Sequence, residues 1–173
     1  MSLAGTAQAN IVSNGGFETG NFSGWTQFGN TGFDSVSTNA LVVQAGSQGA
    51  SFGEVGAFSG IFQTLATTAG ASYQISFWLR NISSVTPNAM AFNWNGGGAE
   101  LSFTNAAAFG YTNYTYLLAA TGATTDLRFG FRHDPAFWAL DTVSVVQVPE
   151  PGSLALVGLA LAGLALAARR KQA

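Results

Sequence analysis

The sequence predicts an antiparallel β-sandwich or jelly roll, followed by one C-terminal transmembrane helix. Only 8% of the residues are charged, whereas Gly, Phe and Trp number 22, 14 and 4, a bias toward strands and tight turns. Between residues 10 and 147, apolar and polar residues alternate in short runs, which is the period of half-buried strands. Residues 154–168 are all apolar or Gly and precede Arg169, Arg170 and Lys171, the pattern of a membrane helix with a cytoplasmic positive flank.

The alternation locates individual strands. Three segments show it best, with these apolar residues on one face: Tyr73, Ile75, Phe77 and Leu79; Met90, Phe92 and Trp94; Leu127, Phe129 and Phe131. Further strands are expected at residues 10–13, 23–28, 33–37, 40–44, 49–53, 60–66, 100–104, 111–120 and 136–146. Such spacing favours two packed sheets, with His133-Asp134-Pro135 as the turn between the last two strands.

The chain divides into three parts. Residues 10–147 form the expected sandwich domain and residues 148–173 the membrane segment with its flanks. Residues 1–9 contain neither a cationic stretch nor an apolar run, but Ala7-Gln8-Ala9 has the form of a signal-peptidase cleavage site. We therefore expect residues 1–9 to be the tail of a signal peptide that begins upstream, with a disordered native terminus as the alternative.

Charge and cysteine content exclude several function classes. Residues 10–148 hold three Arg against seven Asp and Glu, a balance near −4. An acidic surface without a basic stripe repels phosphate backbones, so we expect no nucleic-acid partner. The chain has no Cys, which excludes disulfides, a thiol nucleophile and any cysteine zinc site.

The segment before the apolar run carries a specific motif. In Val148-Pro149-Glu150-Pro151-Gly152, two prolines hold the backbone extended and a Gly releases it. A Pro-Glu-Pro triplet, an apolar helix and an Arg-rich end resemble the PEP-CTERM sorting signal. The resemblance implies export, temporary anchoring in membrane lipid and cleavage near the motif by an exosortase, in Gram-negative bacteria that also make exopolysaccharide. A plain Pro-rich linker to an ordinary anchor is the alternative.

A second resemblance covers most of the domain. It rests on Asn14-Gly15-Gly16-Phe17-Glu18 with Gly24-Trp25, on Tyr73-Gln74-Ile75-Ser76-Phe77, and on Leu140-Asp141-Thr142-Val143-Ser144-Val145. These motifs, in this order, are similar to those of carbohydrate-binding modules with a galactose-binding-like jelly roll. Modules of this kind often carry two acids where this chain has Asp141 followed by Thr142.

The same resemblance points to a structural calcium ion. It implies that Glu18 and Asp141 meet where the first and last strands run side by side. Calcium takes six to eight oxygen ligands, from carboxylates and from the carbonyls that Gly-rich turns expose. The alternative is that both acids cap turns in solvent.

No catalytic constellation is evident from the residues alone. The single histidine, His133, lies beside Asp134 in a turn, and no nucleophile motif or metalloprotease motif accompanies it. We expect this pair to be a solvated loop. A glycosidase would need two facing carboxylates, and the seven acids of residues 10–148 are scattered along the chain.

Aromatic residues on the polar face of a strand are the best candidates for ligand binding, because a sugar ring stacks on them while amides and Arg bond its hydroxyls. Trp78 and Arg80 meet that description, and Asn93 and Arg132, with Arg128, could share their surface. Trp78 could instead lie beneath a loop. Trp25 and Trp94 follow core patterns.

We therefore expect a non-enzymatic surface or matrix protein whose domain binds glycan, with exopolysaccharide as a candidate partner. Two alternatives remain open. The domain could be structural or adhesive without binding sugar, or the protein could be a hydrolase. An open, polar-lined groove at Trp78 would favour sugar binding, and two facing carboxylates in a cleft would favour the hydrolase.

Overall fold

The computed structural model describes residues 9–148, and within that range the regular structure consists of ten β-strands. Their bounds are β1 (Thr26–Phe28), β2 (Ser35–Ser37), β3 (Gly49–Phe52), β4 (Ser59–Ala66), β5 (Ser72–Asn81), β6 (Asn88–Trp94), β7 (Ala99–Thr104), β8 (Phe109–Ala119), β9 (Thr124–His133) and β10 (Trp138–Val148). The predicted C-terminal helix lies outside the described residues. Within residues 9–148, no helix is long and apolar enough to cross a membrane.

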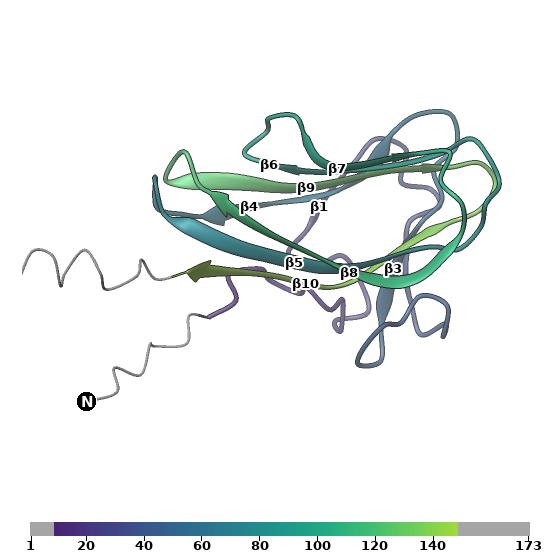
Figure 1. The fold of residues 1–173 in the computed structure, drawn as a ribbon. Coiled ribbons are helices and arrows are strands. Elements are labelled where there is room, and N and C mark those ends of the chain that lie inside the picture. The colour runs from purple at the N-terminus through teal and green to yellow at the C-terminus, as the bar shows by residue number, and fades with distance from the viewer. Residues whose placement is uncertain (1–8, 149–173) are drawn as a thin grey trace, which may run out of the picture.

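The strands form two stacked five-stranded sheets with orders β1-β4-β9-β6-β7 and β2-β3-β10-β5-β8 (Figure 1). All strand pairs are antiparallel. This arrangement confirms the predicted all-β sandwich. The strand β10 lies at the centre of its sheet, and Asn10 at the other end of the domain's chain forms a bridge with Val146 of β10.

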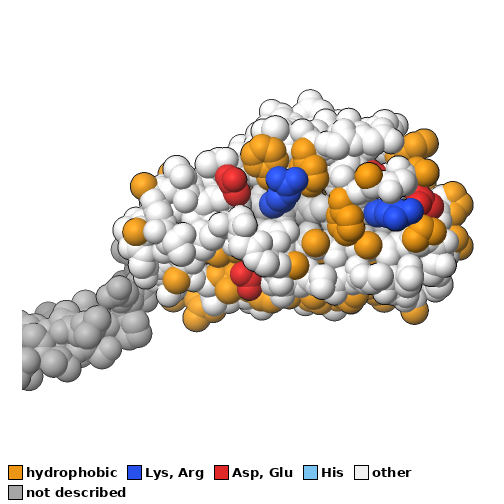
Figure 2. All heavy atoms as spheres, turned by 90° about the horizontal axis from the view of Figure 1, so that it is seen from above, with side chains coloured by type: hydrophobic (Ala, Val, Ile, Leu, Met, Phe, Trp, Pro, Cys, Tyr) orange, Lys and Arg blue, Asp and Glu red, His pale blue; other side chains and the backbone are white. Residues whose placement is uncertain are grey.

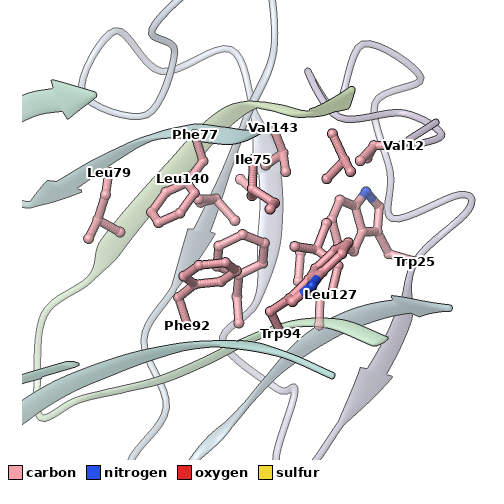
Figure 3. Close-up of a cluster of buried hydrophobic side chains, with 14 of the residues drawn as sticks. Val12, Trp25, Ile75, Phe77, Leu79, Phe92, Trp94, Leu127, Leu140 and Val143 are labelled. Carbon is pink, nitrogen blue, oxygen red and sulfur yellow. The ribbon is translucent and has the colours of Figure 1, made fainter. Parts of the chain in front are cut away.

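Aromatic side chains from both sheets interlock to make the core (Figure 3). Phe77 of one sheet has its ring centroid 5.1 Å from Phe92 and 5.0 Å from Phe129 of the other, and the last pair meets edge to face. Such pairs add about 0.5–1.5 kcal/mol each beyond the area that they bury. Trp25 and Trp94 are buried in the same cluster, as their patterns predicted.

Two predicted strands are absent from the described residues. Residues 10–13 contribute only the bridge at Asn10. The prediction of a strand at residues 40–44 is wrong, because Asn39 begins a tight turn there: its side chain accepts the N–H of Leu41 at 2.8 Å and its carbonyl accepts the N–H of Val42 at 2.8 Å. Val42 is buried although it lies outside the core cluster, and it gives the segment its strand-like apolar pattern.

Candidate functional site

The four predicted ligand-binding residues lie on opposite faces of the sandwich. Trp78 and Arg80 belong to β5 and face outward from the sheet β2-β3-β10-β5-β8. Asn93 of β6 and Arg132 of β9 face outward from the other sheet. The prediction that they share one surface is therefore wrong. Outward side chains of two stacked sheets point in opposite directions, and periodicity alone does not assign a strand to a sheet.

A row of small residues crosses the outer face of the sheet β1-β4-β9-β6-β7. Cross-strand pairing aligns Gly60, Gly130, Ala91 and Ser102, and Phe28 opposes Gly60 at the β1 edge. Side chains in one such row share one face of the sheet. Because these side chains are small, the row forms a shallow floor between the larger side chains on either side.

Aromatic rings lie over this floor. A Cβ atom at Gly130 would lie 3.1 Å from Cδ1 of Phe58 and 3.8 Å from Cζ of Phe28, so both rings use the space that a larger residue would fill. The Phe58 side chain is 46% exposed. Because Gly130 is two residues from both Arg128 and Arg132 on the same face of β9, the Phe58 ring lies between the two arginines along the strand.

The two arginines are held differently. The guanidinium carbon of Arg128 lies 3.7 Å from the centroid of the Phe28 ring and 5.9 Å from that of Phe62, a cation–π arrangement. Within residues 9–148, the Arg128 guanidinium makes no ion pair or hydrogen bond, so its N–H donors remain available. The outward group Phe28, Phe58, Phe62, Arg128 and Arg132 is called the arginine face below.

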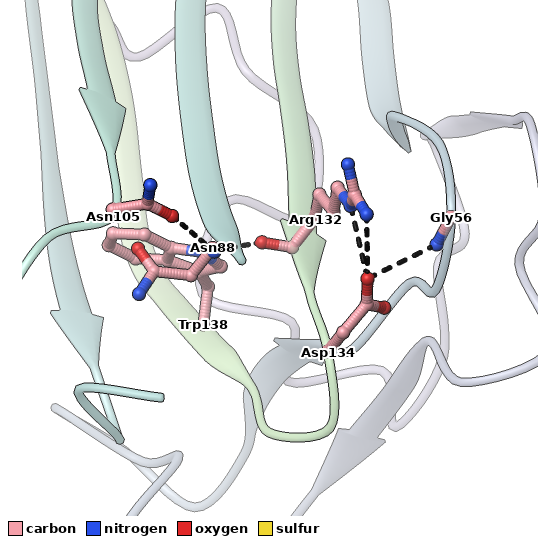
Figure 4. A network of polar contacts seen from close by, with 6 residues as sticks. All are labelled: Gly56, Asn88, Asn105, Arg132, Asp134 and Trp138. Atoms are coloured by element: carbon pink, nitrogen blue, oxygen red, sulfur yellow. Dashed lines mark hydrogen bonds and ion pairs between the residues drawn. The ribbon is translucent and has the colours of Figure 1, made fainter. Parts of the chain in front are cut away.

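Arg132 is fixed by an acid and by the turn after β9. Its Nη2 and Nε lie 2.9 and 3.1 Å from Oδ2 of Asp134, which also accepts the N–H of Gly56 at 3.5 Å (Figure 4). The indole N–H of Trp138 donates to the carbonyl of Arg132 at 3.1 Å. Figure 2 looks onto this outer face and shows cationic groups flanked by hydrophobic side chains.

A segment of chain, residues 38–48, lies against the opposite outer face. Oδ2 of Asp141 accepts the N–H groups of residues 44 and 45 at 2.7 and 3.1 Å. Oε1 of Glu18 accepts those of residues 47 and 48 at 3.0 and 3.2 Å. The hydroxyl of Tyr111 on β8 donates to the carbonyl of Val42. The two predicted metal ligands therefore converge on one segment and anchor it.

Glu18 and Asp141 supply carboxylate oxygens, the ligand type that a hard cation takes. Burial, partly offset by the backbone N–H donors, raises the pKa of Asp141, and the negative charge of Glu18 raises it further. A carboxylate has about four acceptor sites, and each of these two accepts three backbone N–H contacts. Within residues 9–148, no group of three or more His, Asp or Glu is arranged for a metal, so further ligands would be carbonyls or water.

Trp78 and Arg80 lie on the face that this segment partly covers. Trp78 pairs with Asp141 across β10 and is half-buried, and Arg80 pairs with Ala139. A cavity of about 260 Å³ opens nearby between β2, β3 and residues 39–42. Trp78 is not among the residues lining it.

The single histidine is buried, which corrects the expectation of a solvated loop. His133 ends β9, and its Nε2 lies 3.0 Å from both Oδ1 of Asn81 and the carbonyl of Ser83. Burial lowers the pKa of His133. Its hydrogen bonds go to structural partners from the β5 end, so His133 holds two sheets together rather than activating a nucleophile.

Two carboxyl groups meet beneath the arginine face, a pair that sequence spacing did not reveal. Asp34 precedes β2, and Glu54 follows β3 in the loop that leads to Phe58. Glu54 is fully buried, and neither of its oxygens has a hydrogen-bond donor within residues 9–148. Burial and the facing carboxyl of Asp34 raise the pKa of Glu54 to about 9, and burial raises that of Asp34. The Gln27 amide donates to Oδ2 of Asp34 at 3.4 Å, and a shared proton is the donor that Oδ1 of Asp34 and the Glu54 oxygens otherwise lack.

This carboxyl pair does not have the geometry of a glycosidase. Glu54 is fully buried, whereas the two carboxyl groups of a glycosidase face each other across a cleft that holds the sugar. Neither Asp34 nor Glu54 lines the 260 Å³ cavity. The pair therefore lends no support to the hydrolase alternative.

Comparison with protein families gives one match, at the end of the chain. Residues 147–171 match the model of the PEP-CTERM protein-sorting motif. The C-terminal segment is a PEP-CTERM sorting motif. This confirms the resemblance seen in the Pro-Glu-Pro triplet. A comparison with curated proteins returned no significant match.

Solved structures with a similar fold are mainly carbohydrate-binding modules. TmCBM61 in complex with β-1,4-galactotriose has a TM-score of 0.64 and 18% identity, over 81% of this chain and 99% of that one. The CBM22-1 xylan-binding domain of Paenibacillus barcinonensis Xyn10C has a TM-score of 0.57 and 19% identity, over 86% of this chain and 100% of that one. A cleaved adhesin domain of a gingipain from Porphyromonas gingivalis has a TM-score of 0.56 and 16% identity, over 78% of this chain and 96% of that one. At these identities the likeness shows the fold alone.

Sequence reasoning missed the aromatic part of the arginine face. Phe58 lies in a loop, and Phe28 stands at the end of a three-residue strand, so neither belongs to a long alternating run. The only signal in the sequence was Gly130. This glycine leaves a gap between Arg128 and Arg132 on the outward face of β9, into which another side chain can pack.

The Asp34–Glu54 pair predicts a distinctive pH dependence of stability. The pKa of Glu54 is raised from 4.5 to about 9, so between these values the folded state binds more protons than the unfolded state. Stability therefore falls as pH rises, by at most about 1.4 kcal/mol per pH unit. Urea unfolding between about pH 7 and pH 9, above the range in which His133 titrates, should show this slope, and Glu54→Gln should flatten it.

Glu100→Gln is the matched control, because Glu100 is an exposed acid on β7. Its pH profile should follow that of the unmodified protein. If Glu54→Gln keeps the full slope, the buried pair does not share a proton in the way described.

Proposed function

We propose that the chain is an exported, exosortase-processed protein of the cell surface or matrix, and that its domain binds glycan at the arginine face without catalysing a reaction. The observation that carries the proposal is the exposed Phe58 ring over Gly130, between Arg128 and Arg132. A ring of this kind offers a flat apolar surface to the C–H groups of a sugar. The arginines offer fork-shaped donors to its hydroxyls.

The organisation of the face supports binding to an extended chain of sugars. The floor of small residues runs across the strands from Gly60 to Ser102, so it presents a strip rather than a closed pocket. Both arginines are preorganised, Arg128 by Phe28 and Arg132 by Asp134. Preorganised side chains lose little rotamer entropy on binding. A similar fold in complex with β-1,4-galactotriose, and another described as a xylan-binding domain, support the use of such a sandwich for sugar binding.

An adhesive role without sugar binding is the second candidate. One similar fold is an adhesin domain. In that case the exposed Phe58 and the arginines would contact another protein, since Arg and aromatic residues are also enriched at protein interfaces. The glycan experiment below separates the two candidates.

Changing the arginine face should abolish glycan binding. We expect Phe58→Ala and Arg128→Ala, each in the full chain held in a sugar-free detergent, to reduce affinity for soluble polysaccharides on the order of tenfold or more, because each loses a stacking surface or a hydroxyl donor. The affinity of Arg128→Lys should lie between those of the unmodified protein and Arg128→Ala, because lysine keeps the positive charge but lacks the fork-shaped set of donors of the guanidinium. Affinity electrophoresis in gels containing β-1,4-galactan, xylan or bacterial exopolysaccharide measures the effect.

Leu117→Ala is the control for this experiment. Leu117 lies on β8 in the other sheet and is 66% exposed, so its removal tests nonspecific loss of apolar surface. Its retardation should match that of the unmodified protein. A protein that is retarded by none of the polysaccharides would favour the adhesive candidate.

The sorting motif predicts processing at the Pro-Glu-Pro triplet. We propose that exosortase recognises Val148 to Pro151 while the following apolar segment anchors the chain in membrane lipid. Replacing Pro149, Glu150 and Pro151 with Ala should leave the protein uncleaved and membrane-bound, because the alanines remove the extended backbone. Immunoblotting of membrane and medium fractions measures this, and unchanged release into the medium would contradict it.

We also propose that Glu18 and Asp141 hold a structural calcium ion. The segment 44–48 lies across both carboxylates, and a divalent cation would relieve the repulsion between them. Calcium at about 100 times Kd should stabilise the fold by about 2.7 kcal/mol, or raise Tm by about 5–15 °C. Thermal unfolding in calcium, in magnesium and in chelator measures this.

Two variants at Asp141 sharpen the calcium test. Asp141→Asn keeps one oxygen ligand and should weaken the response, whereas Asp141→Ala should abolish it. Identical melting curves in calcium and in chelator would mean that the two acids serve only to anchor the segment through its N–H groups.

A further inference from the structure

The face opposite the arginine face contains a second candidate binding site. Its cavity of about 260 Å³ is lined by Ser35 and Ser37 of β2, Ser51 of β3, Asn39, Leu41, Val42, Ile82 and Phe137. The space suits a single sugar ring and is too small for a folded segment of protein.

One wall of the cavity carries neutral polar groups. Ser35 and Ser51 face each other across β2 and β3 with their hydroxyl oxygens 2.9 Å apart, and the Ser51 hydroxyl also donates to the carbonyl of Ser35 at 3.4 Å, so these two serines bond mainly to each other. Ser37 accepts the N–H of residue 39 at 3.0 Å, which leaves its own hydrogen free. The side-chain oxygen of Asn39 accepts the N–H of Leu41, and its amide NH₂ has no partner within the described range 9–148.

The other wall is apolar and includes a fixed aromatic ring. Phe137 is 37% exposed and precedes β10. A Cβ atom at Gly53 would clash with the Phe137 ring, so the ring lies directly against that glycine. Leu41, Val42 and Ile82 complete the wall. No charged residue lines the cavity.

We propose that this cavity binds one ring of a neutral sugar, with the ring of Phe137 and its apolar neighbours against the C–H face and the Ser37 hydroxyl and Asn39 amide on the hydroxyl groups. Hydroxyl and amide donors opposite an apolar wall are the polarity pattern of a sugar ring. The lack of charge in the lining excludes the strong ion pair that an acidic sugar would seek.

Two sites on opposite faces would make the domain bivalent. The arginine face belongs to the sheet β1-β4-β9-β6-β7, and the cavity belongs to the other sheet. With one saccharide chain bound on each face, a single domain could link two polysaccharide chains. Where both sites bind the same polysaccharide network, the second binding event gains from the high effective concentration that the first creates. The inference extends the proposed function, but its test is independent of the arginine face.

Saturation-transfer NMR on the sugar signals tests the site. The full chain, held in a sugar-free zwitterionic detergent, is mixed separately with galactose, xylose and glucose, and with glucuronate as the charged comparison. At least one neutral sugar should show transfer with a millimolar Kd, about −4 kcal/mol, and glucuronate should show less. Ser37→Leu, which fills the cavity, should reduce the transfer on the order of tenfold.

Three further variants separate the possible results. Ser144→Leu is the matched control, a half-buried serine on the same outer face outside the cavity lining. It should retain the transfer, Phe137→Leu, which keeps bulk but loses the ring, should weaken it, and Arg128→Ala should remove only the part of the transfer that the arginine face contributes. Loss in Arg128→Ala with retention in Ser37→Leu would overturn the second site and leave the proposed function standing. Absence of transfer with every sugar, or equal transfer in Ser37→Leu and Ser144→Leu, would also overturn it.

Discussion

The interlocked aromatic core between the two sheets is the interaction on which the rest of the molecule depends. Phe77, Phe92 and Phe129 come from β5, β6 and β9, and their mutual contacts fix how the two sheets lie on each other. Because side chains alternate along a strand, filling the core in this way determines which residues face outward. The arginine face is thus the other half of the pattern that packs Leu127, Phe129 and Phe131 inside.

Anchored loops then make the two outer faces different. Asp141 and Glu18 hold residues 44–48 across one sheet, which covers part of it and leaves a bounded cavity. On the other sheet, the loop that carries Phe58 is held at its base by the Asp34–Glu54 pair and at Gly56 by Asp134. Buried acids therefore hold loops in position on both faces. Their raised pKa values are the cost of taking carboxyl groups out of water.

The sequence predicted what depends on local pattern and failed where partners are distant along the chain. Period-two alternation located β5, β6 and β9 and the buried Trp25 and Trp94. It could not decide that Trp78 and Arg132 face opposite ways, because strand order depends on long-range pairing. The sequence wrongly predicted a strand at residues 40–44, because the buried Val42 gives this turn an apolar pattern like that of a strand. Glu54 and Asp34 stand twenty positions apart, and no spacing rule links acids that meet only through the fold.

The junction between the domain and its sorting motif is short, and this constrains processing. Strand β10 runs to Val148 and pairs with Ser72 there, whereas the matched motif begins at residue 147. The last strand and the signal therefore share residues. The end of β10, from Ser144 to Val148, pairs with β5, and Val146 bridges to Asn10, so a cut within this part of the strand would remove these contacts. Cleavage after Val148 would spare every one of these contacts. Because proline cannot donate to a sheet and favours extended backbone, the sequence predicts that strand pairing ends before Pro149 and that the segment recognised for cleavage begins there.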